Sequence, residues 1–288
     1  MNDVYDMLFS QGFGKLGAAV MREIDGKNVK VLKCFNSNNY LESYNLYVSG
    51  IKCDGSTIIK FVNYDGMFQI KGLTLPHAEF IPDDFIDNKI ACRLESVSLP
   101  RATKIGHRFL TSAPSLVNIS IPKVREIGTD SLSQVPAMLE FNAPNLQIAY
   151  QGLLNNANRL QTLNVPVLEK INYDHPSGDG VSFGNLVSLR KLNAPKLQRA
   201  GYSVFQNNDY ITKVDLPGIE RLPSMAFYDW PALREINLPN MTECLDYVLN
   251  PKCCKNLQIV NAPKLVEAGI DCHPLIYEAI RKNKENKR

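Results

Sequence analysis

The chain has 288 residues, of which 44% are hydrophobic and 21% are charged, a balance typical of an ordinary globular protein. Its net charge is +3, but the last eight residues, RKNKENKR, hold five basic residues and one acidic residue. Without them the chain has 27 basic and 28 acidic residues. A near-neutral body argues against a nucleic-acid groove, and the lack of an apolar run of about 18 residues predicts no membrane span.

Residues 1–69 are predicted to form an N-terminal capping region made of a helix and short strands. A helical stripe is formed by Val4, Leu8, Leu16, Ala19 and Val20. The segments VKVLKCF, YNLYVSGI and TIIKFVNY read as strands separated by turn residues. We expect this region to cover the open edge of the repeats that follow.

The first residues also bear on where the protein works. They open acidic and lack a basic segment ahead of an apolar core, so they do not resemble a secretory signal. The chain is therefore expected in the cytoplasm as encoded. Secretion, or delivery to a host by a route that needs no N-terminal signal, is the alternative.

A seven-residue motif recurs nine times between Ile70 and Pro263. It consists of a hydrophobic residue, two variable residues, a hydrophobic residue, a polar or small residue, an apolar residue and proline. The nine segments are IKGLTLP (70–76), LESVSLP (94–100), LVNISIP (116–122), MLEFNAP (138–144), LQTLNVP (160–166), LRKLNAP (189–195), ITKVDLP (211–217), LREINLP (233–239) and LQIVNAP (257–263). Successive prolines are 24, 22, 22, 22, 29, 22, 22 and 24 residues apart. A period in the twenties is the signature of a solenoid.

Each unit is expected to contribute one short strand with one face buried, because its apolar positions alternate, as at Leu163 and Val165. Proline ends the strand because it cannot donate to a ladder. Two further inward positions follow, such as Val124 and Ile127. A glycine often comes next, as at Gly106, Gly128, Gly201 and Gly269, which predicts either a positive φ or a close backbone approach. A third inward group closes the coil at Phe85, Phe109, Leu132, Phe205 and Phe227.

The resulting pattern, LxxIxIPxxLxxIGxxxF, resembles the leucine-rich repeats of the bacterial surface antigen BspA and the Treponema repeat class. This resemblance covers residues 70–270. It implies an α/β fold, namely a right-handed solenoid of about nine repeats with a parallel sheet of short strands on one face, capped at both ends. It also implies binding to proteins or host surfaces, and it supplies no shared catalytic residues. The chain departs from the commoner pattern by lacking a cysteine after the AF pair and by placing alanine before proline at Ala143, Ala194 and Ala262.

Residues 271–288 are predicted to form a C-terminal cap helix and a basic tail. The helix follows Pro274 and would cover the last repeat with Leu275, Ile276 and Ile280. The tail is expected to be solvated.

Neither cofactor nor metal is predicted. The seven cysteines (Cys34, Cys53, Cys92, Cys244, Cys253, Cys254 and Cys272) contain no CxxC pair and are interpreted mostly as buried apolar residues or free thiols. Cys244 falls on an inward position, and the adjacent Cys253 and Cys254 could be oxidised. The four histidines form no HExxH motif, and GxSxG and P-loop motifs are absent from the sequence.

Outward positions of the motif define a candidate binding surface. The fifth position is polar in every unit and asparagine in five, which predicts either a ladder of side-chain amides or a recognition surface. Basic residues gather toward the C-terminal half at Arg190, Lys191, Lys213 and Arg234, beside Asp215 and Glu235, on a surface poor in aromatic residues. The 29-residue unit adds a loop at 172–182 that contains Asp174 and His175. It is interpreted as a surface loop or as the rim of the binding surface.

The sequence thus predicts a non-enzymatic, monomeric protein-binding or scaffold protein with an unidentified protein as partner, and one expected setting is that of an effector at a host–microbe interface. A cell-surface adhesin is the alternative. An enzyme with a site in the N-terminal region is the least favoured hypothesis, because catalytic motifs are missing and about 70 residues leave no room for a large catalytic domain.

Overall fold

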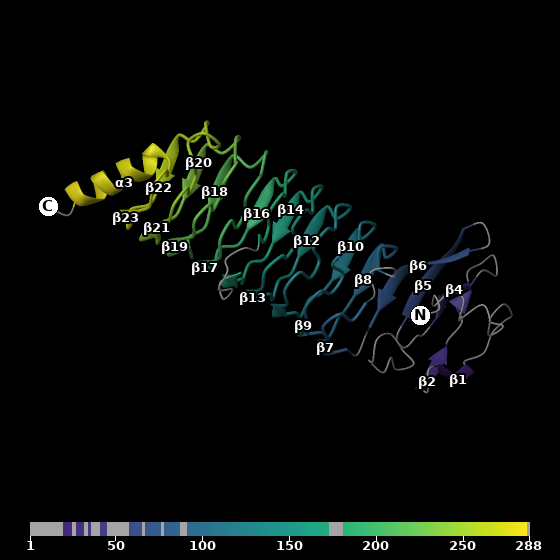
Figure 1. Cartoon of the computed structure of the whole chain (residues 1–288). Helices are drawn as coiled ribbons and strands as arrows, with labels where there is room; N and C mark the ends of the chain where they lie inside the picture. The colour runs from purple at the N-terminus through teal and green to yellow at the C-terminus, as the bar shows by residue number, and fades with distance from the viewer. Residues whose placement is uncertain are drawn as a thin grey trace.

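The computed structural model describes residues 20–24, 27–31, 34–35, 41–44, 58–64, 67–75, 78–86, 91–172 and 181–286, with side chains from residue 72 onward. The described part is a long stack of coils, with short antiparallel strands at one end and a helix at the other (Figure 1). The helical stripe predicted at residues 4–20 lies outside the described residues except for Val20, which begins the first described strand, and the last two residues of the basic tail also lie outside them.

Antiparallel strands occupy the N-terminal end. They are β1 (Val20–Ile24), β2 (Lys27–Val31), β3 (Cys34–Phe35), β4 (Leu41–Tyr44), β5 (Ile58–Tyr64) and β6 (Met67–Thr74). β1 pairs with β2, and β3 to β6 pair in succession. β6 then pairs in parallel with β8, so these strands extend the edge of the solenoid sheet.

The nine motif segments place nine described strands on one side of the molecule, which we call the motif face. These are β6, β8 (Ser96–Ser98), β10 (Asn118–Ser120), β12 (Glu140–Asn142), β14 (Thr162–Asn164), β16 (Lys191–Asn193), β18 (Lys213–Asp215), β20 (Glu235–Asn237) and β22 (Ile259–Asn261). All neighbouring pairs within this set are parallel, in three ladders that end at β10, β16 and β22. The solenoid predicted from the repeat is thereby confirmed.

A second face, which the sequence did not predict, follows each proline corner. It is made of β7 (Phe80–Ile81), β9 (Lys104–Ile105), β11 (Glu126–Ile127), β13 (Ile148–Ala149), β15 (Lys170–Ile171), β17 (Arg199–Ala200), β19 (Arg221–Leu222), β21 (Glu243–Cys244) and β23 (Glu267–Ala268). These short strands pair in parallel in two ladders, β7 to β17 and β19 to β23. Most coils are therefore tied to their neighbours on two sides, whereas both faces are interrupted between the coil of β16 and β17 and the coil of β18 and β19.

The inward positions form one continuous core. Val97, Leu163, Val165, Ile127 and Leu222 are all buried, as the alternation predicted. Ile119 and Leu192 occupy the same motif position but are only partly buried. They lie in β10 and β16, which are the last strands of their ladders, so the core is less covered where the motif face is interrupted.

The third side of each coil has an unusual backbone. In one coil Ser203, Phe205 and Asn207 have φ values of 53°, 61° and 57°, in the left-handed region that bulky residues rarely adopt. Ser203 N and Asn207 N donate to carbonyls of the following coil (3.1 and 2.8 Å), whereas Phe205 N donates to Ser182 O of the preceding coil (3.3 Å). Hydrogen bonding in both directions and burial of the phenyl ring stabilise this conformation.

Glycines near this corner occur where a side chain would collide with a neighbouring coil. Gly128 does not have a positive φ, but a Cβ there would lie 2.6 Å from the carbonyl carbon of Gly106 in the preceding coil. Close approach is thus the reason for glycine at this position. Gly152, one turn later, does have a positive φ of 83°.

The C-terminal helix α3 (Pro274–Glu285) contacts the last coil at β22 and β23. His273 caps its N-terminus, where Nδ1 accepts from Leu275 N at 3.3 Å. Ile276 is fully buried, and Asn283 Nδ2 donates to the carbonyls of Ala262 and Leu265 at 2.8 and 2.9 Å. These two bonds satisfy backbone groups at the end of the solenoid.

Stacked asparagines on the third side give a first testable prediction. Asn185 Nδ2 donates to Asn156 Oδ1 at 2.7 Å, and Asn207 Nδ2 donates to Asn185 Oδ1 at 2.5 Å. Asn185→Ala should lower the free energy of unfolding by about 2–4 kcal/mol, because it removes two hydrogen bonds and places alanine at a φ of 56°. Urea denaturation followed by circular dichroism measures the loss.

Asn185→Gly is the matched control, because glycine tolerates the backbone conformation but cannot form the ladder. It should cost about 1–2 kcal/mol. Equal stability of the alanine variant and the wild type would contradict the structural role of this ladder.

Candidate functional site

Arg190 and Tyr210 form the first element of the candidate binding surface. Arg190 directly precedes β16, and its guanidinium carbon lies 4.4 Å from the centroid of the Tyr210 ring. Tyr210 directly precedes the next motif and is 50% exposed. A cation held against an aromatic face is ordered while its outer edge stays available for an anion. Tyr210 lies just before the motif, so the motif positions alone gave a surface poor in aromatic residues and left this side chain out.

Lys213, Asp215 and Glu235 form the second element. β18 pairs with β20 so that Lys213 faces Glu235, and Lys213 Nζ lies 2.8 Å from Glu235 Oε1. This hydrogen bond raises the pKa of Lys213. Asp215 Oδ1 accepts from Asn237 Nδ2 at 2.7 Å. The two acidic groups are therefore engaged by neighbours within the sheet.

Lys191 and Arg234 are exposed cations on the same face. Lys191 lies in β16, and Arg234 directly precedes β20, where its N–H donates to Thr212 O at 2.8 Å. In the part of the chain that the structure describes, no carboxylate forms an ion pair with Arg190, Lys191 or Arg234. These three cations thus leave positive charge available on the C-terminal half of the motif face.

The N-terminal half of the motif face has a different character. Val117 and Leu139 are 40% and 37% exposed, on either side of the interruption between β10 and β12. Glu95 and Glu140 are also exposed on this half. The motif face therefore changes from apolar and acidic to basic along the stack.

The fifth-position asparagines form a structural ladder, one of the two interpretations of the sequence. Asn193 donates to Asn164 (2.6 Å) and Asn164 to Asn142 (2.7 Å), while Asn261 donates to Asn237 (2.6 Å). These amides are used in bonding one coil to the next, which favours a structural role over recognition.

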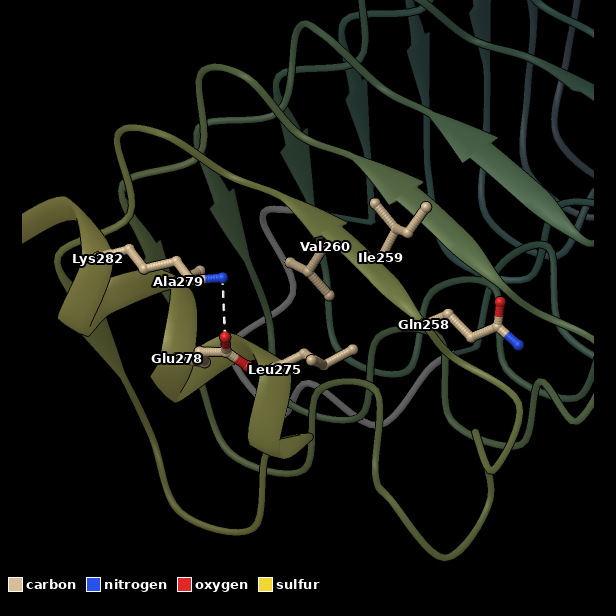
Figure 2. A pocket seen from close by; sticks show the side chains of 7 residues that line it. All are labelled: Gln258, Ile259, Val260, Leu275, Glu278, Ala279 and Lys282. Carbon is tan, nitrogen blue, oxygen red and sulfur yellow. Dashed lines mark ion pairs between the residues drawn. The ribbon is translucent and has the colours of Figure 1, made fainter.

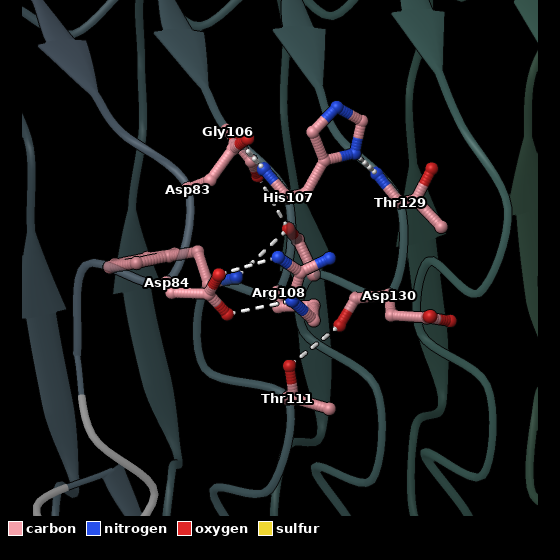
Figure 3. Close-up of polar contacts among 10 residues, drawn as sticks. Asp83, Asp84, Gly106, His107, Arg108, Thr111, Thr129 and Asp130 are labelled. Atoms are coloured by element: carbon pink, nitrogen blue, oxygen red, sulfur yellow. Dashed lines mark hydrogen bonds and ion pairs between the residues drawn. The ribbon is translucent and has the colours of Figure 1, made fainter.

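A second polar cluster lies on the N-terminal coils and contains a histidine, an arginine and carboxylates (Figure 3). Asp83 Oδ1 accepts from His107 N at 2.7 Å, and His107 Nδ1 accepts from Thr129 N at 2.9 Å. Arg108 pairs with Asp84, which lowers the pKa of that carboxyl. These side chains satisfy backbone N–H groups or pair with each other between coils, which is a structural use of residue types that also serve in catalysis.

A shallow pocket of about 310 Å³ lies between α3 and β22 (Figure 2). It is lined by Gln258, Ile259, Val260, Leu275, Glu278, Ala279 and Lys282. Lys282 Nζ lies 2.8 Å from Glu278 Oε1, and the pair stands on the helix side of the pocket. The exposed Ile259 gives the pocket an apolar wall on the strand side.

The loop residues, metal binding and membrane spanning were also considered in the sequence-based predictions. Asp174 and His175 lie outside the described residues, in the interval 173–180. In the described part of the chain, His, Cys, Asp and Glu side chains form no group of three or more suited to a metal ion. No described helix is long and apolar enough to cross a membrane.

The fold and its exposed sheet face define the class of protein: a leucine-rich repeat solenoid, whose coils stack through short parallel strands. The family described as "BspA type Leucine rich repeat region" matches residues 84–175 and 179–269, which is more than half of the chain. The chain therefore belongs to the BspA-type leucine-rich repeat family, as the sequence pattern predicted.

Solved structures of bacterial leucine-rich repeat proteins are similar to this chain. The Treponema pallidum leucine-rich repeat protein is 18% identical, with a TM-score of 0.49 over 78% of this chain and 92% of its own. A leucine-rich cell surface protein from Faecalibacterium prausnitzii is 16% identical, with a TM-score of 0.30 over 76% of this chain and 50% of its own. A leucine-rich repeat protein from Bacteroides ovatus is 12% identical, with a TM-score of 0.31 over 77% of this chain and 79% of its own. The curated proteins include no significant match.

Proposed function

We propose that this chain is a non-enzymatic protein-binding module and that its binding surface is the C-terminal half of the motif face. The observation that carries the proposal is the set of exposed cations at Arg190, Lys191 and Arg234 beside the half-exposed Tyr210. A partner that presents an acidic segment fits this surface. Between these cations, Lys213, Asp215 and Glu235 would contribute polar groups that are already hydrogen-bonded within the sheet.

Arginine and tyrosine are the residue types that most often dominate binding at protein interfaces. Arg190 and Arg234 precede β16 and β20, which are two strand spacings apart along the stack, so their backbones lie roughly 10 Å apart, a distance that about three residues of an extended peptide span. Both residues directly precede strands of the stacked coils, so little backbone ordering is needed when the partner binds. An extended acidic segment running along the stack could therefore meet both guanidinium groups.

The test replaces the exposed cations together. A variant with Arg190→Ser, Lys191→Ser and Arg234→Ser should fold normally, because surface substitutions cost little stability. Its affinity for a fluorescent oligoglutamate peptide, used as a charge probe, should fall about tenfold, measured by anisotropy at low salt. The same variant should lose proteins that the wild-type chain captures by cross-linking.

The matched control changes the same amount of charge elsewhere. Lys123→Ser, Lys196→Ser and Arg199→Ser remove three exposed cations from other parts of the coils, Arg199 being on the second face. This variant should bind like the wild type. Equal loss in both variants would show that only net charge matters and would contradict a site on the motif face.

The loop residues Asp174 and His175 are proposed as a separate contact. The described ends of this loop, Asn172 and Val181, follow β15 on the second face and precede the third side of the coil. Asp174→Ser with His175→Ser should therefore change oligoglutamate binding less than the triple variant does. A larger effect would move the centre of the surface to the loop.

Cell fractionation distinguishes the places where binding would occur. Native protein found wholly in the cytosol would exclude a surface adhesin. Protein found at the cell surface or in host cells would instead support action at a host–microbe interface.

A further inference from the structure

Two cysteines from different coils face each other at the C-terminal end of the solenoid. Cys244 lies in β21, and Cys272 lies between β23 and α3. Their sulfur atoms are 4.0 Å apart, and the residues are 1% and 3% exposed. A disulfide needs a sulfur–sulfur distance of about 2 Å, so side-chain rotation with a small shift of one coil end would suffice to join them.

The surroundings distinguish the two sulfur atoms. The contact with the Cys244 sulfur lowers the pKa of Cys272. The same contact, together with burial, raises the pKa of Cys244. Cys272 is therefore the better nucleophile of the two, since the thiolate is the reactive form.

Cys272 lies at the end of the last coil, where the chain enters α3. It directly precedes the N-cap of α3, and in this helix only Ile276 is fully buried. Tyr277 closes the corner: its hydroxyl donates to Gly269 O at 2.7 Å and accepts from Cys272 N at 3.2 Å. Exposure of Cys272 therefore requires the first turn of α3 to lift and Ile276 to leave the core, which is a local opening at the end of the stack.

We propose that Cys244 and Cys272 are a redox modification site, in which a reversible disulfide ties the start of α3 to β21. A low-molecular-weight disulfide such as oxidised glutathione is the oxidant. The Cys272 thiolate attacks one glutathione sulfur, which forms a mixed disulfide and releases one glutathione thiolate. Cys244 then loses its proton and attacks the Cys272 sulfur, which releases the second glutathione. The protein loses two electrons and two protons, and oxidised glutathione becomes two molecules of reduced glutathione.

The test begins with the fully reduced, full-length protein. After incubation with oxidised glutathione, its intact mass should fall by about 2 Da, and peptide mapping should find Cys244 joined to Cys272. Cys254→Ala is the matched control, because Cys254 is equally buried and burial raises its pKa to about 12. This variant should form the same cross-link as the wild type, whereas Cys244→Ala should stop at the mixed disulfide on Cys272.

Limited proteolysis supplies a second measurement that does not need a variant. Trypsin can cleave α3 at Arg281, Lys282 and Lys284. Cleavage there should be several-fold slower in the oxidised protein than in the reduced protein, because the disulfide holds the start of the helix on the coil. Absence of the Cys244–Cys272 cross-link, or a stable mixed disulfide at Cys272 in the wild type, would overturn the proposal. Equal cleavage rates would overturn the tethering of α3.

Discussion

Leu99→Asp is expected to destabilise the protein by about 4 kcal/mol or more, measured by urea denaturation. The Leu99 side chain is fully buried directly after β8, and its backbone N donates to Ser120 O in the next coil at 2.8 Å. The substitution loses the burial of a leucine side chain. It also places a carboxyl group in the stacked core, where the group must either take up a proton or remain charged without a partner, and both are costly. Because coils depend on their neighbours, the damage should spread along the stack.

Ser98→Asp is the control for this experiment. Ser98 precedes Leu99 in the chain, lies within β8 and has a partly exposed side chain. The same charge on this outward position should change the free energy of unfolding by no more than about 0.5 kcal/mol. If the two variants lose stability equally, the inward and outward assignment of the motif is wrong.

The motif face could be predicted from the sequence because its signals are local. A strand with one buried face requires alternation, and proline marks where each strand must end, so Pro100 and Pro122 set the register of their coils without further information. Cys244 shows the same logic, since its inward position was predicted from the repeat and its side chain is buried.

The second face and the third side could not be predicted in the same way. Strands such as β9 and β11 are two residues long, too short for alternation to show. Leu132 and Phe227 have left-handed φ values, which bulky side chains disfavour. These values persist because backbone groups on this side form hydrogen bonds with both the preceding and the following coil. Such tertiary constraints leave little trace in one repeat.

The candidate surface was partly readable from the sequence. Arg190, Lys191 and Arg234 are exposed as expected, but which cations stay free depends on pairing across coils. Lys213 is paired with Glu235 because β18 and β20 align in register. Tyr210 joins Arg190 across two coils, a contact that only stacking produces.

The core around Trp230 gives the second large expected effect. Trp230 is the single tryptophan of the chain and is fully buried. Its ring meets Phe227 edge-on with centroids 5.1 Å apart, next to a stack in which Phe183, Phe205 and Phe227 have centroid separations of 5.5 and 5.4 Å. Its Nε1–H donates to the carbonyl of Phe205 in the preceding coil. One side chain thus joins two coils by packing and by a hydrogen bond.

Trp230→Ala should lower the free energy of unfolding by about 4 kcal/mol or more, because it leaves a large cavity and an unsatisfied buried carbonyl. Trp230→Phe keeps most of the ring packing and loses only the donor, so it should cost about 1–3 kcal/mol. Far-ultraviolet circular dichroism in urea measures both variants, since neither retains tryptophan fluorescence. Equal losses would assign the effect to the hydrogen bond alone, whereas a loss below about 1 kcal/mol in Trp230→Ala would contradict the claim that this residue links the coils.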